Sequence, residues 1–266
     1  MVDSSPMYSG TPKALIFIPA RFDSSRFPGK PLSLLGGKSM VRRVYENVKS
    51  CGHPCAVVTD DDRIEAHLKE SKARVVRVDD ETTNGTERIA LAYERYFKGR
   101  GEEADVIVNV QGDEPLLQGS LISQLIDFHL TSPFDVATLA LLQDAKEKTG
   151  ASPHVVKVRL GEGGKCEDFF RDPPKTGPTY YQHIGVYSYR RKALERFVSL
   201  PPSERERREG LEQWRGLEGG LEYGAMVAPR GTVLVGIDRP RDLFRAQEVL
   251  EKGDISHVGE ESHGQS

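Results

Sequence analysis

The sequence has little cysteine, with only three in 266 residues. Cys51, Cys55 and Cys166 are too few for the disulfide framework of a small secreted domain, which favours a reducing, cytoplasmic environment. Cys51 and Cys55 flank His53, but a structural zinc site needs four ligands and Cys166 is distant in the sequence. We therefore predict a turn between a helix and a strand at residues 51–55, rather than a metal site.

The chain also lacks a long apolar run and an excess of basic charge. Its longest apolar run, residues 14–18, is too short to cross a bilayer, and residues 1–13 do not have the pattern of a secretory signal. It carries 37 basic and 40 acidic residues, a net charge of −3, whereas nucleic-acid-binding domains usually have a basic excess. We expect neither membrane insertion nor nucleic-acid binding.

Two familiar phosphate-binding motifs are incomplete. The Gly-Lys-Ser at residues 37–39 resembles the end of a P-loop, but the glycine required five positions before Gly37 is replaced by Leu32. The Gly-Glu-Gly at 161–163 begins a dinucleotide fingerprint whose last glycine would fall on Cys166, and it does not follow the first strand. Both breaks argue against a P-loop protein and a nicotinamide or flavin enzyme.

What the sequence does have is a regular alternation of apolar runs and helical patterns. Apolar runs predict strands at residues 14–18, 56–59, 74–78, 105–110 and 136–142. Helical spacing between them predicts helices at 39–50, 63–70, 86–97 and 121–130. Strands that are apolar throughout and are joined by helices predict an α/β fold, with a mostly parallel sheet covered by helices on both faces.

The second half of the chain is less regular. Strands are predicted at 155–159, 184–189, 223–227 and 233–235, and helices at 192–199, 205–218 and 240–251. Residues 161–179 are rich in glycine and proline and predict a long irregular loop, of a kind that often binds a ligand or a second subunit.

The loop after the first strand concentrates positive charge on an acidic chain. Residues 19–31 carry Arg21, Arg26 and Lys30 against one acid. Ligands of open α/β sheets bind beyond the carboxyl ends of the strands, where this loop should lie. Arginine forks and a lysine ammonium suit phosphate oxygens, and Ser24 adds a small donor. The loop therefore predicts a phosphate site, with a solvated basic loop as the alternative.

Two aspartates follow predicted strands at distant positions. Asp113 lies beyond the strand at 105–110, and Asp238 lies between the strand at 233–235 and the last helix. Carboxylates at such positions suit Mg²⁺, which is bound by oxygen ligands and substrate phosphates. Asp238 could instead be only the N-cap of the helix that follows. We hypothesise that the two aspartates converge on one metal, which their spacing in the sequence cannot show.

Four further motifs carry a family resemblance. They are Asn84-Gly-Thr-Glu-Arg88, the run Val-Asn-Val-Gln-Gly-Asp-Glu-Pro at 108–115, His183-Ile-Gly-Val-Tyr187 and Leu211-Glu-Gln-Trp-Arg215. Together with the loop at 19–31, and in this order, they resemble the 3-deoxy-manno-octulosonate cytidylyltransferases, which are sugar nucleotidyltransferases. The resemblance covers residues 13–250. It implies transfer of CMP from CTP to the anomeric hydroxyl of 3-deoxy-D-manno-octulosonate (Kdo), with Mg²⁺ and release of pyrophosphate, for lipopolysaccharide biosynthesis.

The resemblance also implies an architecture. It implies a Rossmann-like fold with a smaller dimerisation lobe, and a homodimer. We expect a single nucleotidyltransferase domain over residues 13–251. Its nucleotide-binding half would span about 13–142, its sugar-binding and dimerisation part about 143–235, and a return to the main sheet about 233–251. Residues 1–12 and 252–266 would be flexible tails.

Roles for individual residues follow from the same resemblance. The implied nucleotide contacts are Ala20, Arg21, Ser24, Arg26, Lys30, Asp60, Gly85 and Arg88. The implied sugar contacts are Gln111, Arg171, His183, Tyr187, Glu212 and Gln213. Asp113 and Asp238 would hold Mg²⁺ and, with Arg21 and Lys30, would be the catalytic residues.

The chain departs from the family pattern around two of these residues. Arg171 follows Glu-Asp-Phe-Phe, where the family usually has Tyr-Phe-Ser before the arginine, so its role stays open. Asp238 stands in Ile-Asp-Arg-Pro rather than Val-Asp-Thr-Pro. Outside their motifs, His183 and Tyr187 would be ordinary core residues, and Glu212 and Gln213 would be solvated helix residues.

Three alternatives stay open. A glycosyltransferase of similar fold would bind a nucleotide sugar through an Asp-containing metal motif and would release a nucleotide instead of pyrophosphate. A non-catalytic nucleotide-sugar binder would bind CTP without any turnover. Within the resembled family, the sequence also leaves open whether the sugar is Kdo or an amino-substituted analogue.

Overall fold

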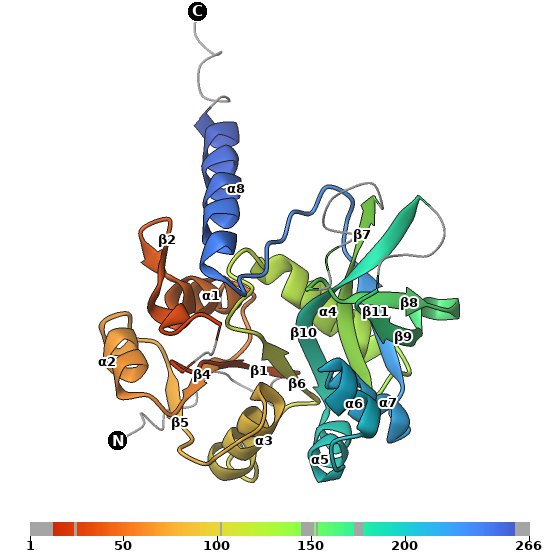
Figure 1. Cartoon of the computed structure of the whole chain (residues 1–266). Coiled ribbons are helices and arrows are strands. Elements are labelled where there is room, and N and C mark those ends of the chain that lie inside the picture. The colour runs from red at the N-terminus through yellow and green to blue at the C-terminus, as the bar shows by residue number, and fades with distance from the viewer. Residues whose placement is uncertain are drawn as a thin grey trace, which may run out of the picture.

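A mixed sheet forms the centre of the molecule (Figure 1). The computed structural model describes residues 13–23, 26–101, 103–144, 152, 154–172 and 178–258, the last five by backbone alone. Neighbouring strands follow in the order β11 (Tyr223–Val227), β7 (Val136–Asp144), β10 (Thr179–Arg190), β6 (Val106–Val110), β1 (Ala14–Pro19), β4 (Cys55–Thr59) and β5 (Val75–Arg77). Within this row only β10 runs antiparallel to its neighbours, which confirms the predicted mostly parallel sheet.

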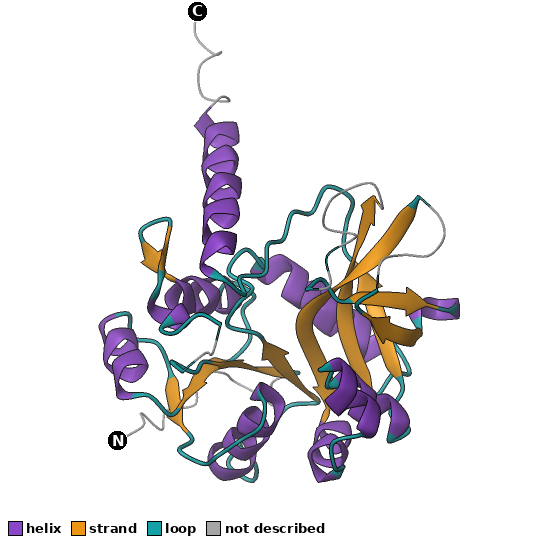
Figure 2. Cartoon of the chain, viewed as in Figure 1, coloured by secondary structure: helices purple, strands orange, loops and turns teal. Residues whose placement is uncertain are grey.

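Alternating residues of the strands face two separate apolar layers. In β1, Leu15 and Phe17 pack in the layer that contains α3 (Gly85–Tyr96) and α5 (Arg191–Ser199). Ile16 and Ile18 pack in the opposite layer, which contains α1 (Met40–Lys49), α2 (Asp62–Glu70) and α4 (Gly119–Thr131). Helices therefore cover both faces, as Figure 2 shows and as the apolar strand pattern predicts.

Side-chain caps fix the starts of three helices. The Ser39 hydroxyl accepts from the Arg42 amide at the start of α1, and the Asp61 carboxylate accepts from the Arg63 and Ile64 amides at the start of α2. The Asn84 side chain accepts from the Glu87 amide at the start of α3. Such caps satisfy amides that have no partner inside the helix. They explain why the predicted helix starts agree with the structure to within a residue or two.

The segment predicted as a long loop contains regular structure. Strands β8 (Lys157–Leu160) and β9 (Cys166–Phe170) pair antiparallel around the short 3₁₀ helix η2 (Glu162–Gly164). Gly163 has a φ of 65°, and the Gly161 amide donates to the Lys165 carbonyl over 2.7 Å. The glycines therefore close a hairpin, so the prediction of an irregular loop over 161–179 was wrong for residues 162–170. Residues 173–177 lie outside the described part of the chain.

Two other predicted elements differ from the structure. The helix predicted at 205–218 is two helices, α6 (Glu204–Glu209) and α7 (Gln213–Glu218), because Gly210 takes a left-handed φ of 63° and ends α6. The strand predicted at 233–235 is absent among the described residues of that segment. Val235 and Ile237 instead bury their side chains in a third apolar cluster with Leu35 and Met40.

The remaining elements lie near the ends of the chain. The loop after β1 ends in η1 (Lys30–Leu32), and β2 (Leu34–Leu35) and β3 (Lys38–Ser39) form a hairpin around Gly36 and Gly37. The Gly-Lys-Ser at residues 37–39 therefore belongs to a hairpin and not to a phosphate-binding loop. Helix α8 (Pro240–Val258) continues past residue 251, where the C-terminal tail was predicted to begin. Residues 1–12 and 259–266, the rest of the two predicted tails, are not described.

No helix within the described ranges is long and apolar enough to span a bilayer. The three cysteines are free thiols, with Cys55 and Cys166 buried and Cys51 half-buried. The turn between α1 and β4 contains both Cys51 and His53, as the sequence predicts for residues 51–55.

Candidate active site

The basic loop after β1 contacts both of the candidate aspartates. Lys30 Nζ lies 2.9 Å from Asp113 Oδ2 and 3.0 Å from the Ile237 carbonyl oxygen. Arg26 forms an ion pair with Asp238. Gly29 makes this approach possible because its φ of 71° turns the chain into η1, a conformation that few other residues adopt. The loop thus joins residues that are distant in the sequence.

A backbone hydrogen bond brings Asp113 and Asp238 to the same place. The Ile237 amide donates to the Asp113 carbonyl over 2.9 Å. Each aspartate side chain is 34% exposed, so both carboxylates can reach a ligand. The start of α8 is capped by Asp242, which accepts from the amides of Asp238 and Arg239. The Asp238 carboxylate pairs with Arg26 and does not serve as the cap.

A cavity of about 650 Å³ opens beside these acids. It is lined by both aspartates, by Arg26 and by all six residues predicted to contact a sugar: Gln111, Arg171, His183, Tyr187, Glu212 and Gln213. The sugar set comes from the segment after β6, from β10, from the residue after β9, from the segment before α7 and from the first residue of α7. The structure therefore brings the two candidate metal ligands and the sugar set together around one cavity.

The wall formed by β10 is hydrogen-bonded and buried. The Tyr187 hydroxyl accepts from Gln213 Nε2 over 2.6 Å, and His183 Nε2 lies 3.0 Å from Thr138 Oγ1. Burial lowers the pKa of His183 to about 3, so the imidazole is neutral at physiological pH. Gln213 Oε1 is buried with no hydrogen-bond partner among the described residues. This oxygen is therefore suited to accept a hydrogen bond from a hydroxyl of a ligand.

Arg171 has a structural contact set besides facing the cavity. Its guanidinium donates to the carbonyls of Glu209, Gly210 and His154, each over 3.3 Å. The first two carbonyls lie at the carboxyl end of α6, where cations are favourable. Burial, with a smaller contribution from Arg26, lowers the pKa of Arg171. Arg171 thus supports the cavity wall and also contributes positive charge to it.

Several predicted nucleotide contacts form a second group near the start of α3. Arg88 is buried and donates to Asp60 and to the Val78 carbonyl, each over 2.6 Å. Arg21 donates to Thr82, and burial lowers its pKa, with Arg88 as the next cause. These contacts of Arg88 support the segment before α3, while its Nε is buried with no hydrogen-bond partner among the described residues; its nucleotide contact stays a prediction.

The other predicted nucleotide contacts sit where the backbone is tightly packed. Ala20 is buried, and its amide donates to the Val58 carbonyl over 2.9 Å. A Cβ on Gly85 would lie 2.9 Å from Pro19 Cγ, so only glycine fits beside β1. None of Ala20, Arg21, Asp60, Gly85 and Arg88 lines the 650 Å³ cavity. Ser24 lies outside the described residues.

Sequence reasoning missed Glu114, which also lines the cavity. Its side chain is buried, and Oε2 has no hydrogen-bond partner among the described residues. Burial raises its pKa to about 8, and the adjacent Asp113 adds to the shift. The available signal was a pair of acids that follows a buried strand, but only Asp113, the first of the two, was predicted to have a site role.

Three arginines of the last segment were missed as well. Arg239, Arg241 and Arg245 line the cavity from the start of α8, next to Asp238. Arg239 replaces the threonine expected from the family pattern. That difference is visible in the sequence, but the sequence does not show that the side chain lines the cavity.

Comparisons with known proteins show the family of the chain. A cytidylyltransferase family model matches residues 15–224. Curated 3-deoxy-manno-octulosonate cytidylyltransferases are 38% identical in Porphyromonas gingivalis (88% of this chain and 95% of the relative) and 37% identical in Rhodospirillum rubrum (94% and 100%).

Solved structures give the same result. A structure described as CMP:2-keto-3-deoxy-manno-octonic acid synthetase complexed with CTP has a TM-score of 0.80 and 30% identity, and covers 91% of this chain and 99% of its own. A putative glucose-1-phosphate thymidylyltransferase from Bacillus anthracis, at 16% identity and a TM-score of 0.64, shares the fold. The chain belongs to the cytidylyltransferase family, among the 3-deoxy-manno-octulosonate cytidylyltransferases.

Proposed function

We propose that the chain transfers CMP from CTP to the anomeric hydroxyl of Kdo, giving CMP-Kdo and pyrophosphate. The observation that carries the proposal is the meeting of two aspartates and the six candidate sugar contacts around one cavity, with Arg26 in its lining and Lys30 paired with Asp113. The curated relatives are named for this transfer, and the similar solved structure is described as complexed with CTP. The acids and cations lie beyond the carboxyl ends of β1 and β6, where open α/β sheets bind ligands.

The two aspartates fit a magnesium ion. Mg²⁺ is usually held by one or two carboxylates together with substrate phosphates, rather than by a complete set of protein ligands. Asp113 and Asp238 offer such a pair, and both carboxylates are accessible. Bound there, the ion would neutralise phosphate charge and lower the pKa of the attacking hydroxyl.

Lys30 and Arg26 would then exchange partners. Each now pairs with one of the aspartates, and each could turn to a phosphate oxygen once the carboxylates are otherwise engaged. The anomeric hydroxyl would attack the α-phosphorus in line, with pyrophosphate leaving and no covalent enzyme intermediate. Catalysis would come from positioning and from offsetting negative charge, in which Arg21 would also take part.

The sugar-facing residues would select an acidic sugar rich in hydroxyls. Arg171 and Arg26 would attract its carboxylate, while Gln111, Tyr187 and neutral His183 would meet hydroxyls. Gln213 Oε1 and Glu114 Oε2 are buried polar atoms without partners in the described chain. A ligand that failed to pair them would bind poorly, which would discriminate against wrong sugars.

The assembly and setting are further parts of the proposal. The sugar-binding part carries the β8–β9 hairpin, and within the described residues β9 pairs only with β8. Trp214 covers part of this strand, because its Nε1 donates to the Phe169 carbonyl, and strand edges left unpaired are ready surfaces for pairing with a second chain. We propose a cytoplasmic homodimer that uses this part of the fold and serves lipopolysaccharide biosynthesis. Light scattering on the purified protein would test the dimer.

One assay separates the candidate functions. The protein is incubated with CTP, Mg²⁺ and a panel of keto-acid sugars that includes Kdo and an amino-substituted analogue, and pyrophosphate is followed. The proposal predicts pyrophosphate release with Kdo. Release of a nucleotide from a nucleotide sugar, without pyrophosphate, would indicate a glycosyltransferase. Binding of CTP with no product would indicate a non-catalytic binder.

A further inference from the structure

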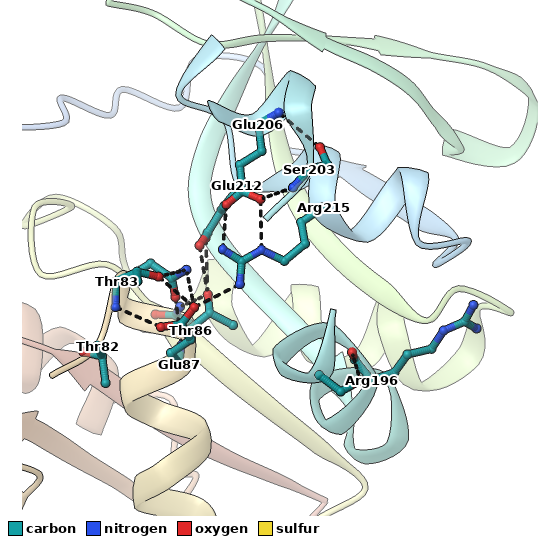
Figure 3. A network of polar contacts seen from close by, with 12 residues as sticks. Thr82, Thr83, Thr86, Glu87, Arg196, Ser203, Glu206, Glu212 and Arg215 are labelled. Atoms are coloured by element: carbon teal, nitrogen blue, oxygen red, sulfur yellow. Dashed lines mark hydrogen bonds and ion pairs between the residues drawn. The ribbon is translucent and has the colours of Figure 1, made fainter. Parts of the chain in front are cut away.

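A buried arginine outside the cavity joins two parts of the fold (Figure 3). Arg215 lies in α7 and is 3% exposed. Its Nε and Nη2 donate to the two carboxylate oxygens of Glu206 over 2.9 and 2.8 Å. Its Nη1 donates to Glu87 Oε1 over 2.9 Å. One side chain therefore binds acids from α6 and α3, and it does not itself line the cavity.

Both acids are anchored at helix starts. Glu206 closes a capping box with Ser203 at the start of α6. Glu87 accepts from the Thr83 amide over 2.8 Å and from the Thr83 hydroxyl over 2.7 Å, just before α3. These contacts hold the carboxylates in place, so Arg215 fastens α6 and α7 to the first turn of α3.

The same junction contains a candidate sugar contact. Both carboxylate oxygens of Glu212 lie 3.3 Å from Thr86 Oγ1, which itself accepts from Asn109 Nδ2 over 3.2 Å. Glu212 and Gln213 directly precede Trp214 and Arg215, and both line the cavity. The position of α7 relative to α3 therefore decides where these two side chains meet a ligand.

We propose that Arg215 is a positioning residue that determines sugar use. Acting through Glu87 and Glu206, it holds Glu212 and Gln213 against the cavity, in register with the start of α3. The inference rests on the proposed function and adds to it, because the resemblance assigned no role to Arg215. It also explains why α7 needs an arginine, since a lysine would keep the charge but lacks the planar fork that spans two acids.

The test compares Arg215→Lys with Arg205→Lys. Arg205 is a matched control because, among the described residues, its side chain makes no ion pair or ring contact with α3. It pairs with Asp168 and Glu209, and its Cζ lies 3.2 Å from the centroid of the Trp214 ring. We expect Arg215→Lys to raise KM for the sugar about tenfold or more while KM for CTP changes less than about twofold. Arg205→Lys should leave both KM values near those of the native protein, even if its Tm falls.

The alternative is that Arg215 only stabilises the fold, as buried ion pairs sometimes do. In that case both KM values would be unchanged, or would change together, and the inference would be overturned. If Arg215→Lys does not fold, Glu87→Ala removes the same link from the α3 side and should show the same selective rise in sugar KM.

A second measurement does not need turnover. Hydrogen exchange at residues 211–216 should quicken in Arg215→Lys and not in Arg205→Lys, with residues 136–144 unchanged in both. Equal exchange in the two variants would overturn the positioning role. Failure of the native protein to release pyrophosphate with CTP and Kdo would instead count against the proposed function, and equal exchange in the two variants would still overturn the positioning role of Arg215.

Discussion

Lys30 and Arg26 neutralise the two carboxylates that we propose as magnesium ligands. Each cation offsets the negative charge of its aspartate at short range. Glu114 follows Asp113 directly, yet its side chain is buried away from such a partner. Burial raises the pKa of Glu114, so the two neighbouring acids of the motif can be tested by different measurements.

Asp113→Asn should remove a metal ligand without unfolding the protein. The amide is close in shape but carries no charge, so we expect turnover to fall on the order of 10²–10⁴-fold. Pyrophosphate release measures the turnover, and a thermal melt measures the fold. Asp62→Asn, at an exposed ion pair with Arg77 far from the cavity lining, is the control and should be active. Near-native turnover in Asp113→Asn would remove this residue from the metal site.

Gln213→Ala should impair sugar use selectively. The change removes the buried acceptor Oε1 and the donor to the Tyr187 hydroxyl. We expect KM for the sugar to rise at least about tenfold, since a lost hydrogen bond to an uncharged group is worth about 1 kcal/mol and the Tyr187 hydroxyl also loses its donor. CTP affinity, measured by calorimetry, should stay within about twofold. A loss confined to CTP affinity would contradict the placement of Gln213.

Glu114→Gln should change how stability depends on pH. The pKa of Glu114 is raised to about 8 in the fold, whereas in the unfolded chain it is near its usual value of about 4.3. The raised pKa favours the folded state at low pH, and this contribution is lost as pH rises from about 4 to 8. The variant lacks the titrating group, so its Tm relative to the native protein should improve by about 7–14 °C between pH 5 and 8, since the pKa difference is worth about 3.6 kcal/mol over that range. A parallel pH dependence in both proteins would show that Glu114 is ionised in the fold.

At the scale of elements, the starts of helices and the apolar strands were predictable, and the breaks within elements were not. Asn84 and Asp61 are residues whose side chains cap helices, so local chemistry marks those starts. Gly210 gave no comparable signal, because a glycine inside a charged helical pattern is compatible with a continuous helix. Val235 and Ile237 have strand-like character, but their side chains are buried against Leu35 and Met40 without a paired strand.

Gly210→Ala should test the break between α6 and α7. No atom lies within 4 Å of the added Cβ, so the cost comes from the left-handed φ of 63° alone. That conformation costs about 1–2 kcal/mol for an L residue, or about 2–8 °C in Tm for a chain of this size. Gly210→Asn should recover part of the loss, because asparagine tolerates this region better. Equal Tm values for the glycine and alanine proteins would mean that the break does not depend on this conformation.

At the scale of the whole molecule, the candidate active site joins segments that are far apart in the chain, and no local sequence pattern shows that they lie close together. Asp113 and Asp238 meet because the Ile237 amide binds the Asp113 carbonyl, a contact between the ends of two separate segments. The motif resemblance assigned roles to nine of the cavity-lining residues, whereas the place of Glu114 and of three arginines at the start of α8 in the lining became visible only in space. Sequence patterns report local preference and burial, and they contain no distance between segments that are far apart in the chain.

CTP binding should stabilise the whole fold only when the metal is present. A ligand at about 100 times its Kd adds about 2.7 kcal/mol to stability, which corresponds to about 5–10 °C in Tm for a protein of this size. We expect this rise with CTP and Mg²⁺, and a much smaller one with CTP and a chelator, since the triphosphate then faces Asp113 and Asp238 without a cation between them. Lys30→Ala should lose most of the rise, although its Tm without ligand should be near that of the native protein. An equal rise with and without Mg²⁺ would mean that the two aspartates do not hold a metal with the nucleotide.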